Sequence, residues 1–158
     1  MDALLFELAG ARFALSVTCV REVVRAVHVD PLPHAPCVIA GVINYRGTVI
    51  PVIDTRSRLE LPAKPVSPED HFVITEAFGR NLALHIDAPL DLADISPVPL
   101  GEVSAELLPH EGHAGYIHGV VPTHDGVLLI QDLPAFLSHD EVALLDRALA
   151  AGPQGSGV

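Results

Sequence analysis

The residues with the most obvious chemical potential are histidines that cluster in the second half of the chain. They are His110, His113, His118 and His124, and Glu111 and Asp125 lie beside them. Imidazole and carboxylate groups can bind zinc, but such a site needs ligands held in a fixed geometry. Glycines at positions 112, 115 and 119 work against that geometry. We therefore interpret residues 101–119 as a long exposed loop and predict no metal site and no cofactor. A metal-dependent enzyme built on these histidines is the alternative.

Nucleophilic catalysis has no recognisable motif in this sequence. The serines lack the context of a nucleophile elbow, and neither Cys19 nor Cys37 stands beside a candidate base. The spacing of these two cysteines fits neither a metal site nor a disulfide framework, so we expect reduced thiols. A phosphate-binding glycine loop is also missing. We therefore predict that the chain is not an enzyme.

The most informative charged residue is Arg46, which lies at the tip of an apolar hairpin. The runs Gly41–Tyr45 and Thr48–Asp54 are rich in β-branched residues, which favour strands. Arg46 and Gly47 join the two runs, and Gly47 can adopt the positive φ that a tight turn needs. A guanidinium at such a tip is unusual, which makes this hairpin the candidate site of the chain.

The hairpin and its flanks resemble the signature of the CheW family, whose members couple a chemotaxis histidine kinase to receptors. The family pattern is approximately Gly-Val-Ile-Asn-Leu-Arg-Gly, two apolar residues, Pro, two apolar residues and Asp-Leu-Arg. The chain reads GVINYRGTVIPVIDTR over residues 41–56. It departs from the pattern at Tyr45 and Thr55, where the family usually has leucine. Asp54 and Arg56 close the run with charges that can pair locally or with a partner.

The resemblance implies an all-β fold of two intertwined, five-stranded SH3-like β-barrels that share a core and carry a C-terminal α-helix. The sequence agrees, because strand patterns occur at about 4–58 and again at about 70–136. A capping box at Ser138 and an apolar face through Val142, Leu145 and Leu149 predict the helix. We predict one CheW-like domain over 1–152, with a first barrel at about 1–68, a second at about 69–137, the helix at 139–151 and a flexible tail at 153–158.

The same resemblance implies where partners bind. Val20 and Glu22 match the family's valine-x-glutamate at the start of the third strand and would belong to a receptor-facing surface. Glycines 41 and 47 would keep the nearby backbone uncrowded. We expect Glu22 and Arg46 to form an ion pair, because the resemblance places their strands near each other. The predicted partner-binding residues are Val20, Glu22, Gly41, Asn44, Tyr45, Arg46, Gly47, Asp54 and Arg56. Asp87, Asp91 and Asp94 are predicted to form a solvated acidic face, and an interaction edge is the alternative.

Charge and hydropathy limit the classes of partner. A formal charge of −11 opposes binding to phosphate backbones, so we predict no nucleic acid partner. The sequence contains neither a secretory signal nor an apolar run long enough to insert into a membrane, which favours a cytoplasmic protein. The resemblance implies two partners: the CheW-like regulatory domain of a histidine kinase on the first barrel, and the helical-hairpin tip of a chemoreceptor in the groove between the barrels. A diverged protein that serves a non-flagellar pathway, or binds one partner, is the alternative.

Overall fold

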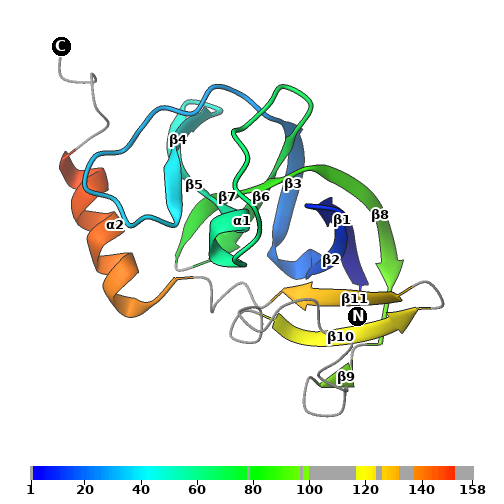
Figure 1. The fold of residues 1–158 in the computed structure, drawn as a ribbon. Helices are drawn as coiled ribbons and strands as arrows, with labels where there is room; N and C mark the ends of the chain where they lie inside the picture. The colour runs from blue at the N-terminus through cyan, green and yellow to red at the C-terminus, as the bar shows by residue number, and fades with distance from the viewer. Residues whose placement is uncertain are drawn as a thin grey trace.

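The computed structural model describes residues 2–77, 79–96, 98–99, 117–123, 126–131 and 137–151. Its strands are β1 (Asp2–Leu8), β2 (Ala11–Ser16), β3 (Val20–Arg25), β4 (Ile39–Tyr45), β5 (Thr48–Ile53), β6 (His71–Ala77), β7 (Arg80–Ile86), β8 (Ala88–Asp94), β9 (Val98–Pro99), β10 (Ile117–Thr123) and β11 (Gly126–Gln131). A 3-10 turn, η1 (Val17–Cys19), and two helices, α1 (Thr55–Arg58) and α2 (His139–Ala151), complete these elements (Figure 1). The predicted tail at 153–158 and most of the predicted loop lie outside the described residues, while β10 occupies its last three positions.

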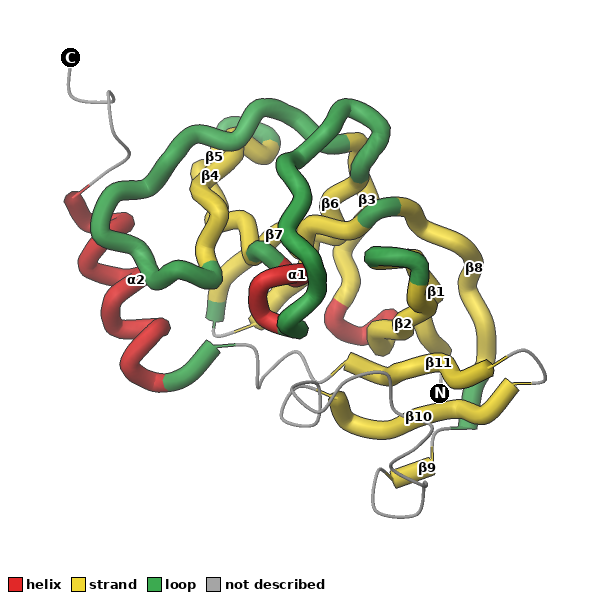
Figure 2. Tube along the Cα trace, viewed as in Figure 1, coloured by secondary structure: helices red, strands yellow, loops and turns green. Residues whose placement is uncertain are grey.

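Two sheets make up the described part of the fold, which confirms the all-β prediction with a C-terminal helix. One sheet has the strand order β8-β1-β2-β11-β10-β9, and the other has the order β3-β6-β7-β5-β4. The sheets are intertwined, since the chain leaves the first sheet after β2, builds the whole second sheet, and returns at β8 (Figure 2). The predicted division at residue 68 is therefore not the division between the sheets. The parallel pairs β2–β11 and β5–β7 create this arrangement, and hairpin patterns in a sequence do not reveal such long-range pairs.

Two hairpins are closed by turns in which both central residues have positive φ. Ala9 and Gly10 have φ values of 53° and 81°, and Arg46 and Gly47 have values of 52° and 83°. This is the type I′ geometry, whose twist matches that of the flanking strands. The predicted reversal at Arg46-Gly47 is confirmed, with Tyr45 opposite Thr48 in the register.

The largest hydrophobic cluster is shared by the two sheets and by α2. It contains Phe6 and Phe13 of the first sheet, whose rings stack with centroids 5.9 Å apart, and Leu84 of the second. A smaller cluster lies on the other face of the second sheet and includes Phe72 and Ile74. Neighbouring residues on β6 thus alternate between two apolar clusters, so this strand is buried on both faces. The shared core ties the sheets into one folding unit.

The second sheet curls until the segment that follows β3 reaches β4. Within the described part of the chain β3 and β4 lie at opposite ends of the strand order, yet Asp30, just beyond β3, forms a bridge with Val42 of β4. The bridge consists of two backbone hydrogen bonds, Asp30 N to Val42 O at 2.9 Å and Val42 N to Asp30 O at 2.8 Å. We call the line along which β3 and its continuation meet β4 the seam.

Helix α2 docks on the shared core as its sequence pattern predicts. Leu145 and Ala148 are buried in the large cluster, with Val142 and Leu149 packed against it. The Ser138 Oγ accepts from the Glu141 amide at 3.1 Å, and a Glu141 carboxylate oxygen accepts from the Ser138 amide at 2.9 Å. These reciprocal bonds are the capping box. No helix in the described ranges is long and apolar enough to cross a membrane.

Candidate partner-binding site

Glu22 of β3 joins the seam to the β4–β5 turn through two hydrogen bonds. Its Oε2 accepts from Arg46 Nη2 at 2.6 Å, and its Oε1 accepts from the Tyr45 hydroxyl at 2.8 Å. The predicted Glu22–Arg46 ion pair is therefore confirmed. The side chain of Arg46 is 72% exposed and that of Glu22 is 29% exposed. We call Glu22, Tyr45 and Arg46 the seam cluster.

The turn that carries Arg46 is held by contacts of its own. The Asn44 Oδ1 accepts from the Gly47 amide at 2.8 Å, which fixes the tip from inside. The guanidinium carbon of Arg46 lies 5.2 Å from the centroid of the Tyr45 ring, a cation–π contact. The hydrogen bond to the Glu22 carboxylate raises the pKa of Tyr45 above its ordinary value, and burial makes a smaller contribution in the same direction. The cluster thus presents a guanidinium in a fixed position.

The two signature glycines serve different purposes. A Cβ at Gly41 would lie 2.2 Å from Asp30 O and 2.7 Å from Val29 Cγ1, so the bridge that closes the seam needs glycine there. Nothing lies within 4 Å of a Cβ built at Gly47, where the requirement is the φ of 83°. The prediction that glycine keeps the nearby backbone uncrowded therefore applies to Gly41, whereas Gly47 is needed for its positive φ.

Val20, Asp54 and Arg56 lie apart from the seam cluster, and Arg56 is buried. Val20 begins β3, is half-buried and packs against the large cluster. Asp54 caps α1, where its Oδ1 accepts from the Ser57 amide at 3.1 Å. Arg56 is 6% exposed, so its guanidinium is held inside the protein instead of on a partner-facing surface.

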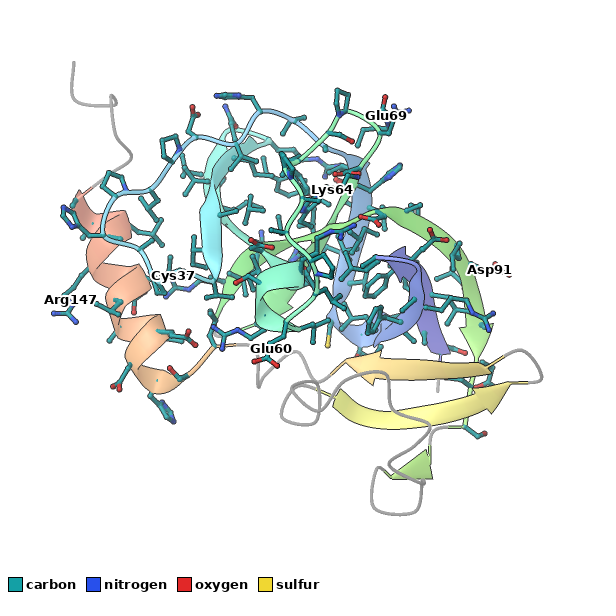
Figure 3. The ribbon with its side chains drawn as sticks, viewed as in Figure 1. Cys37, Glu60, Lys64, Glu69, Asp91 and Arg147 are labelled. Carbon is teal, nitrogen blue, oxygen red and sulfur yellow. The ribbon has the colours of Figure 1, made fainter. Side chains whose placement is uncertain are left out.

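Asp87 pairs with Arg56. This pairing corrects the prediction that Asp87 lies on a solvated acidic face. Arg56 Nη2 lies 2.8 Å from Asp87 Oδ1 and 2.7 Å from Oδ2, and the Ala9 amide donates to Oδ2 at 3.0 Å. The Asp87 amide donates to Glu7 O at 3.0 Å. Asp87 lies between β7 and β8, where the chain passes from the second sheet to the first. We call Asp87 and Arg56 the crossover pair. Asp91 is exposed on β8, as predicted (Figure 3).

A second buried polar group, which sequence reasoning missed, anchors the connector between α1 and β6. The side chains of Asp70 and His85 are each 3% exposed, and Asp70 Oδ2 lies 2.7 Å from His85 Nε2. Lys64 Nζ donates to Asp70 Oδ1 at 3.1 Å, and the Ser67 amide donates to Oδ2 at 3.0 Å. Burial alone would raise the pKa of Asp70, but these bonds outweigh it and lower the pKa to about 2. The sequence feature that could have indicated this buried group was an aspartate directly before a strand.

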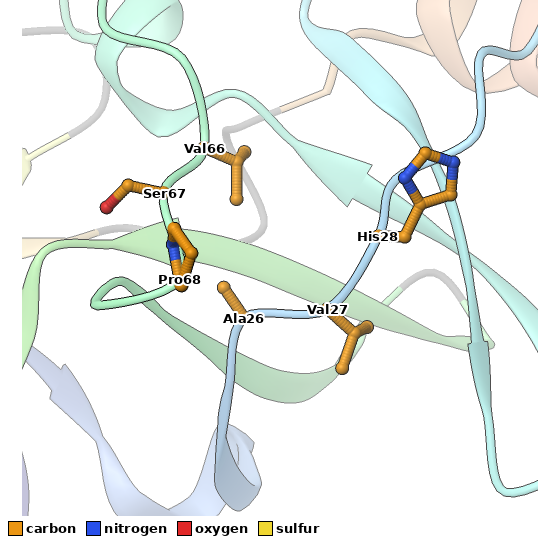
Figure 4. A pocket seen from close by; sticks show the side chains of 6 residues that line it. All are labelled: Ala26, Val27, His28, Val66, Ser67 and Pro68. Atoms are coloured by element: carbon orange, nitrogen blue, oxygen red, sulfur yellow. The ribbon is translucent and has the colours of Figure 1, made fainter.

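A hollow of about 200 Å³ lies beside this anchor. It is lined by Ala26, Val27, His28, Val66, Ser67 and Pro68 (Figure 4). The Ala26 amide donates to the Asp70 carbonyl at 3.0 Å, so Asp70 fixes both walls of the hollow. Val66 and Pro68 make the connector wall of the hollow apolar.

Exposed apolar side chains accompany the charges on two strands. Val49, beside the β4–β5 turn, is 51% exposed, and Leu90 and Leu92 of β8 are 46% and 67% exposed. β8 ends the strand order of its sheet in the described part of the chain. Within the described ranges no three His, Cys, Asp or Glu side chains gather in a way that could hold a metal ion. The segment with His110, His113 and His124 lies outside those ranges.

Comparison with known proteins places the chain in a family. The family model of the CheW-like domain matches residues 2–141. The chain belongs to the CheW family. The probable chemotaxis protein CheW of Rhizobium etli is 28% identical over 145 residues, covering 89% of each protein. The chemotaxis protein CheW of Rhizobium meliloti is 30% identical over 103 residues, which cover 62% of this chain and 66% of that protein.

A solved structure agrees with the assignment to the CheW family. The scaffolding protein TtCheW from Thermoanaerobacter tengcongensis matches with a TM-score of 0.74 and 27% identity. The match covers 89% of this chain and 94% of that protein. Protein FrzA of Myxococcus xanthus is also similar, with 32% identity over 109 residues. The intertwined sheets described above are therefore a CheW-like fold.

Proposed function

We propose that the chain is a non-catalytic, cytoplasmic scaffold that couples chemoreceptors to a chemotaxis-type histidine kinase. The observation that carries this proposal is the seam cluster, which fixes an exposed guanidinium at a position where the family signature matches. Similarity to chemotaxis proteins and to a scaffolding protein over most of the chain supports it. Such a protein works through complementary surfaces and needs no cofactor.

Two partners follow from the proposal. The CheW-like regulatory domain of the kinase would bind the predicted first barrel, which carries the signature hairpin of β4 and β5, and the helical-hairpin tip of a chemoreceptor would lie in the groove between the two barrels. Apolar contact at Val49 beside the charge of Arg46 has the composition of a binding centre with a charged rim. Val20 and Glu22 would lie on the receptor-facing side.

Reconstitution tests the proposal. The purified chain is mixed with the kinase and with membranes that contain the receptor, and co-sedimentation and kinase autophosphorylation are measured. We expect the kinase to sediment with the receptor membranes only when the chain is present, and its autophosphorylation to respond to the receptor only then. If the kinase sediments with the receptor membranes and responds to the receptor equally well without the chain, the proposal is contradicted.

A charge-reversal pair of variants locates the binding surface. Arg46→Glu should weaken co-sedimentation, whereas Arg147→Glu makes the same change of charge on the outer side of α2 and should not (Figure 3). Equal losses for the two variants would indicate a general charge effect.

One observation favours a second candidate within the same family. Tyr45 replaces the usual leucine at the centre of the seam cluster and adds a hydrogen bond to Glu22. A diverged CheW-like scaffold, serving a non-flagellar pathway or binding one partner, would carry such a change. The same reconstitution separates the candidates, because a one-partner scaffold would bind either the kinase or the receptor but would not join them.

A further inference from the structure

The seam is closed by different kinds of contact at its two described points. At one point the backbones of Asp30 and Val42 are bonded directly. At the other point the contact is between side chains, since Glu22 of β3 reaches Tyr45 and Arg46 at the end of β4. Closure near the β4–β5 turn therefore depends on what holds the Glu22 carboxylate.

The two donors to Glu22 differ in how firmly they are held. The Tyr45 ring is half-buried and packs against the cluster that contains Phe72 and Ile74. Arg46 is 72% exposed, and its guanidinium has five donors, whereas the phenol has one. The two donors also use different oxygens of Glu22. Loss of the arginine contact leaves the tyrosine contact geometrically intact.

We propose that Tyr45 is a positioning residue that holds Glu22 on the seam independently of Arg46. Arg46 can then exchange Glu22 for an acidic group of a partner while the seam stays closed. The leucine usual at this position in the family would fill the apolar space without donating a hydrogen bond. The exchange rests on the proposed function, but the positioning role concerns the chain alone.

A double-mutant cycle on the isolated chain tests the positioning role. Tyr45→Phe removes the hydroxyl, and Arg46→Asn removes the guanidinium while suiting the φ of 52°. Opening of the seam is read from hydrogen exchange of the Asp30 and Val42 amides, which the bridge protects. We expect changes of less than about twofold for each single variant and more than about tenfold for the double variant, well above the product of the single effects and on the scale of one hydrogen bond to a charged group. Additive effects would overturn the proposal, as would full opening by either single variant.

The control removes a comparable carboxylate contact from the same sheet. Glu76 pairs with Arg21 between β6 and β3, which the backbone already joins. Glu76→Gln should therefore leave exchange at Asp30 and Val42 unchanged, alone or with Arg46→Asn. If Glu76→Gln with Arg46→Asn opened the seam as much as Tyr45→Phe with Arg46→Asn, any loss of a carboxylate contact would loosen the sheet, and the proposal would be overturned.

A spectroscopic titration supplies a readout that packing alone would not change. The chain has two tyrosines and no tryptophan, so tyrosinate absorbance in a Tyr116→Phe background reports on Tyr45. We expect its pKa to lie above the ordinary value of about 10 and to fall when Glu22→Gln removes the charged acceptor. A pKa of Tyr45 that is unshifted and does not change with Glu22→Gln would overturn the proposal.

The partner exchange is tested by adding the kinase and the receptor membranes to the same variants. We expect Arg46→Asn to weaken binding by tenfold or more while the seam stays closed, whereas Glu76→Gln, which lies outside the predicted partner-binding residues, should retain binding. Binding that survives Arg46→Asn would overturn the exchange. If the unmodified chain binds neither partner, the proposed function fails, whereas the cycle on the isolated chain still decides the role of Tyr45.

Discussion

Arg46 combines an exposed charge with a backbone conformation that suits glycine or asparagine better than arginine. Its φ of 52° lies in the left-handed region, which costs a non-glycine residue roughly 1 kcal/mol. The ion pair with Glu22 and the contact with the Tyr45 ring offset this strain. An exposed ion pair contributes only about 0–1 kcal/mol to stability, so the binding role proposed for Arg46 would account for its exposed guanidinium better than stability does.

A charge exchange between Glu22 and Arg46 tests whether their ion pair couples the proposed kinase-binding and receptor-binding surfaces. Arg46→Glu should impair binding or kinase control far more than it lowers the melting temperature. The exchange Glu22→Arg with Arg46→Glu should recover part of the loss if the pair stays formed in the complex, and none if Arg46 leaves Glu22 for the partner. Binding and kinase activity are measured for the four chains of the cycle. Strict additivity, without recovery in the exchange, would mean that each residue contacts a partner separately.

Asp70 makes stability depend on acid pH. Its folded pKa of about 2 lies below the value of 3.8 that applies without these contacts, so the folded state favours the charged form. The stabilisation, about 2 kcal/mol, is complete above about pH 4 and is lost as the pH falls towards 2. Urea unfolding over this range should show the difference between the chain and Asp70→Asn shrinking with falling pH.

Glu69 provides the control for this pH dependence. It neighbours Asp70 in sequence but is exposed (Figure 3). Glu69→Gln should therefore reproduce the pH profile of the unmodified chain. A difference between the chain and Asp70→Asn that stays constant down to pH 2 would contradict the role given to the Asp70 charge.

At the scale of elements, closure of the second sheet depends on how closely β4 approaches the segment after β3. Gly41→Ala would place a methyl group against Asp30 O, so it should break the bridge and cost about 1–3 kcal/mol, as overpacking typically does. Faster exchange at the Asp30 and Val42 amides should accompany the loss of stability.

Gly47→Ala is the matched comparison for the element prediction. This position has open space but a φ of 83°, so the cost should be about 1 kcal/mol without exposure of the bridge. Unfolding free energies and amide exchange separate the two variants. Equal effects on Asp30 exchange would show that strain in the hairpin, and not contact at Gly41, controls closure.

At the scale of the whole molecule, the crossover pair joins parts that are remote in sequence. Arg56 follows β5 in α1, Asp87 follows β7, and the Ala9 turn of the first sheet donates to the same carboxylate. A buried ion pair adds little net stability, but removing one partner leaves an uncompensated charge. Asp87 thus fixes the junction of the two sheets.

Asp87→Asn tests this junction. It should lower the free energy of unfolding by about 3–5 kcal/mol, because Arg56 then stays buried without a counter-charge. Asp91→Asn changes the same residue type on the exposed part of β8 and should have an effect within about 0.5 kcal/mol. Chemical denaturation measures both. A small, equal effect would show that the junction does not depend on the charge of Asp87.

The sequence by itself determined what is local or carried by a motif. Strand periodicity, the Arg46-Gly47 turn and the capping box at Ser138 depend on neighbouring residues, so they could be predicted with their approximate bounds. The signature over residues 41–56 indicated the family and, through it, the Glu22–Arg46 pair. The intertwined sheets also came from the resemblance and not from periodicity.

The tertiary structure alone decided which distant strands pair and which charges are buried. β2–β11 and β5–β7 are parallel pairs between segments far apart in the chain, and no turn signal encodes them. Arg56 and Asp87 look like surface charges in the sequence, as does Asp70, because a charged residue has the same local pattern whether it meets solvent or a buried partner. Their burial depends on the return of the chain at β7 and β8, and only the assembled fold contains that information.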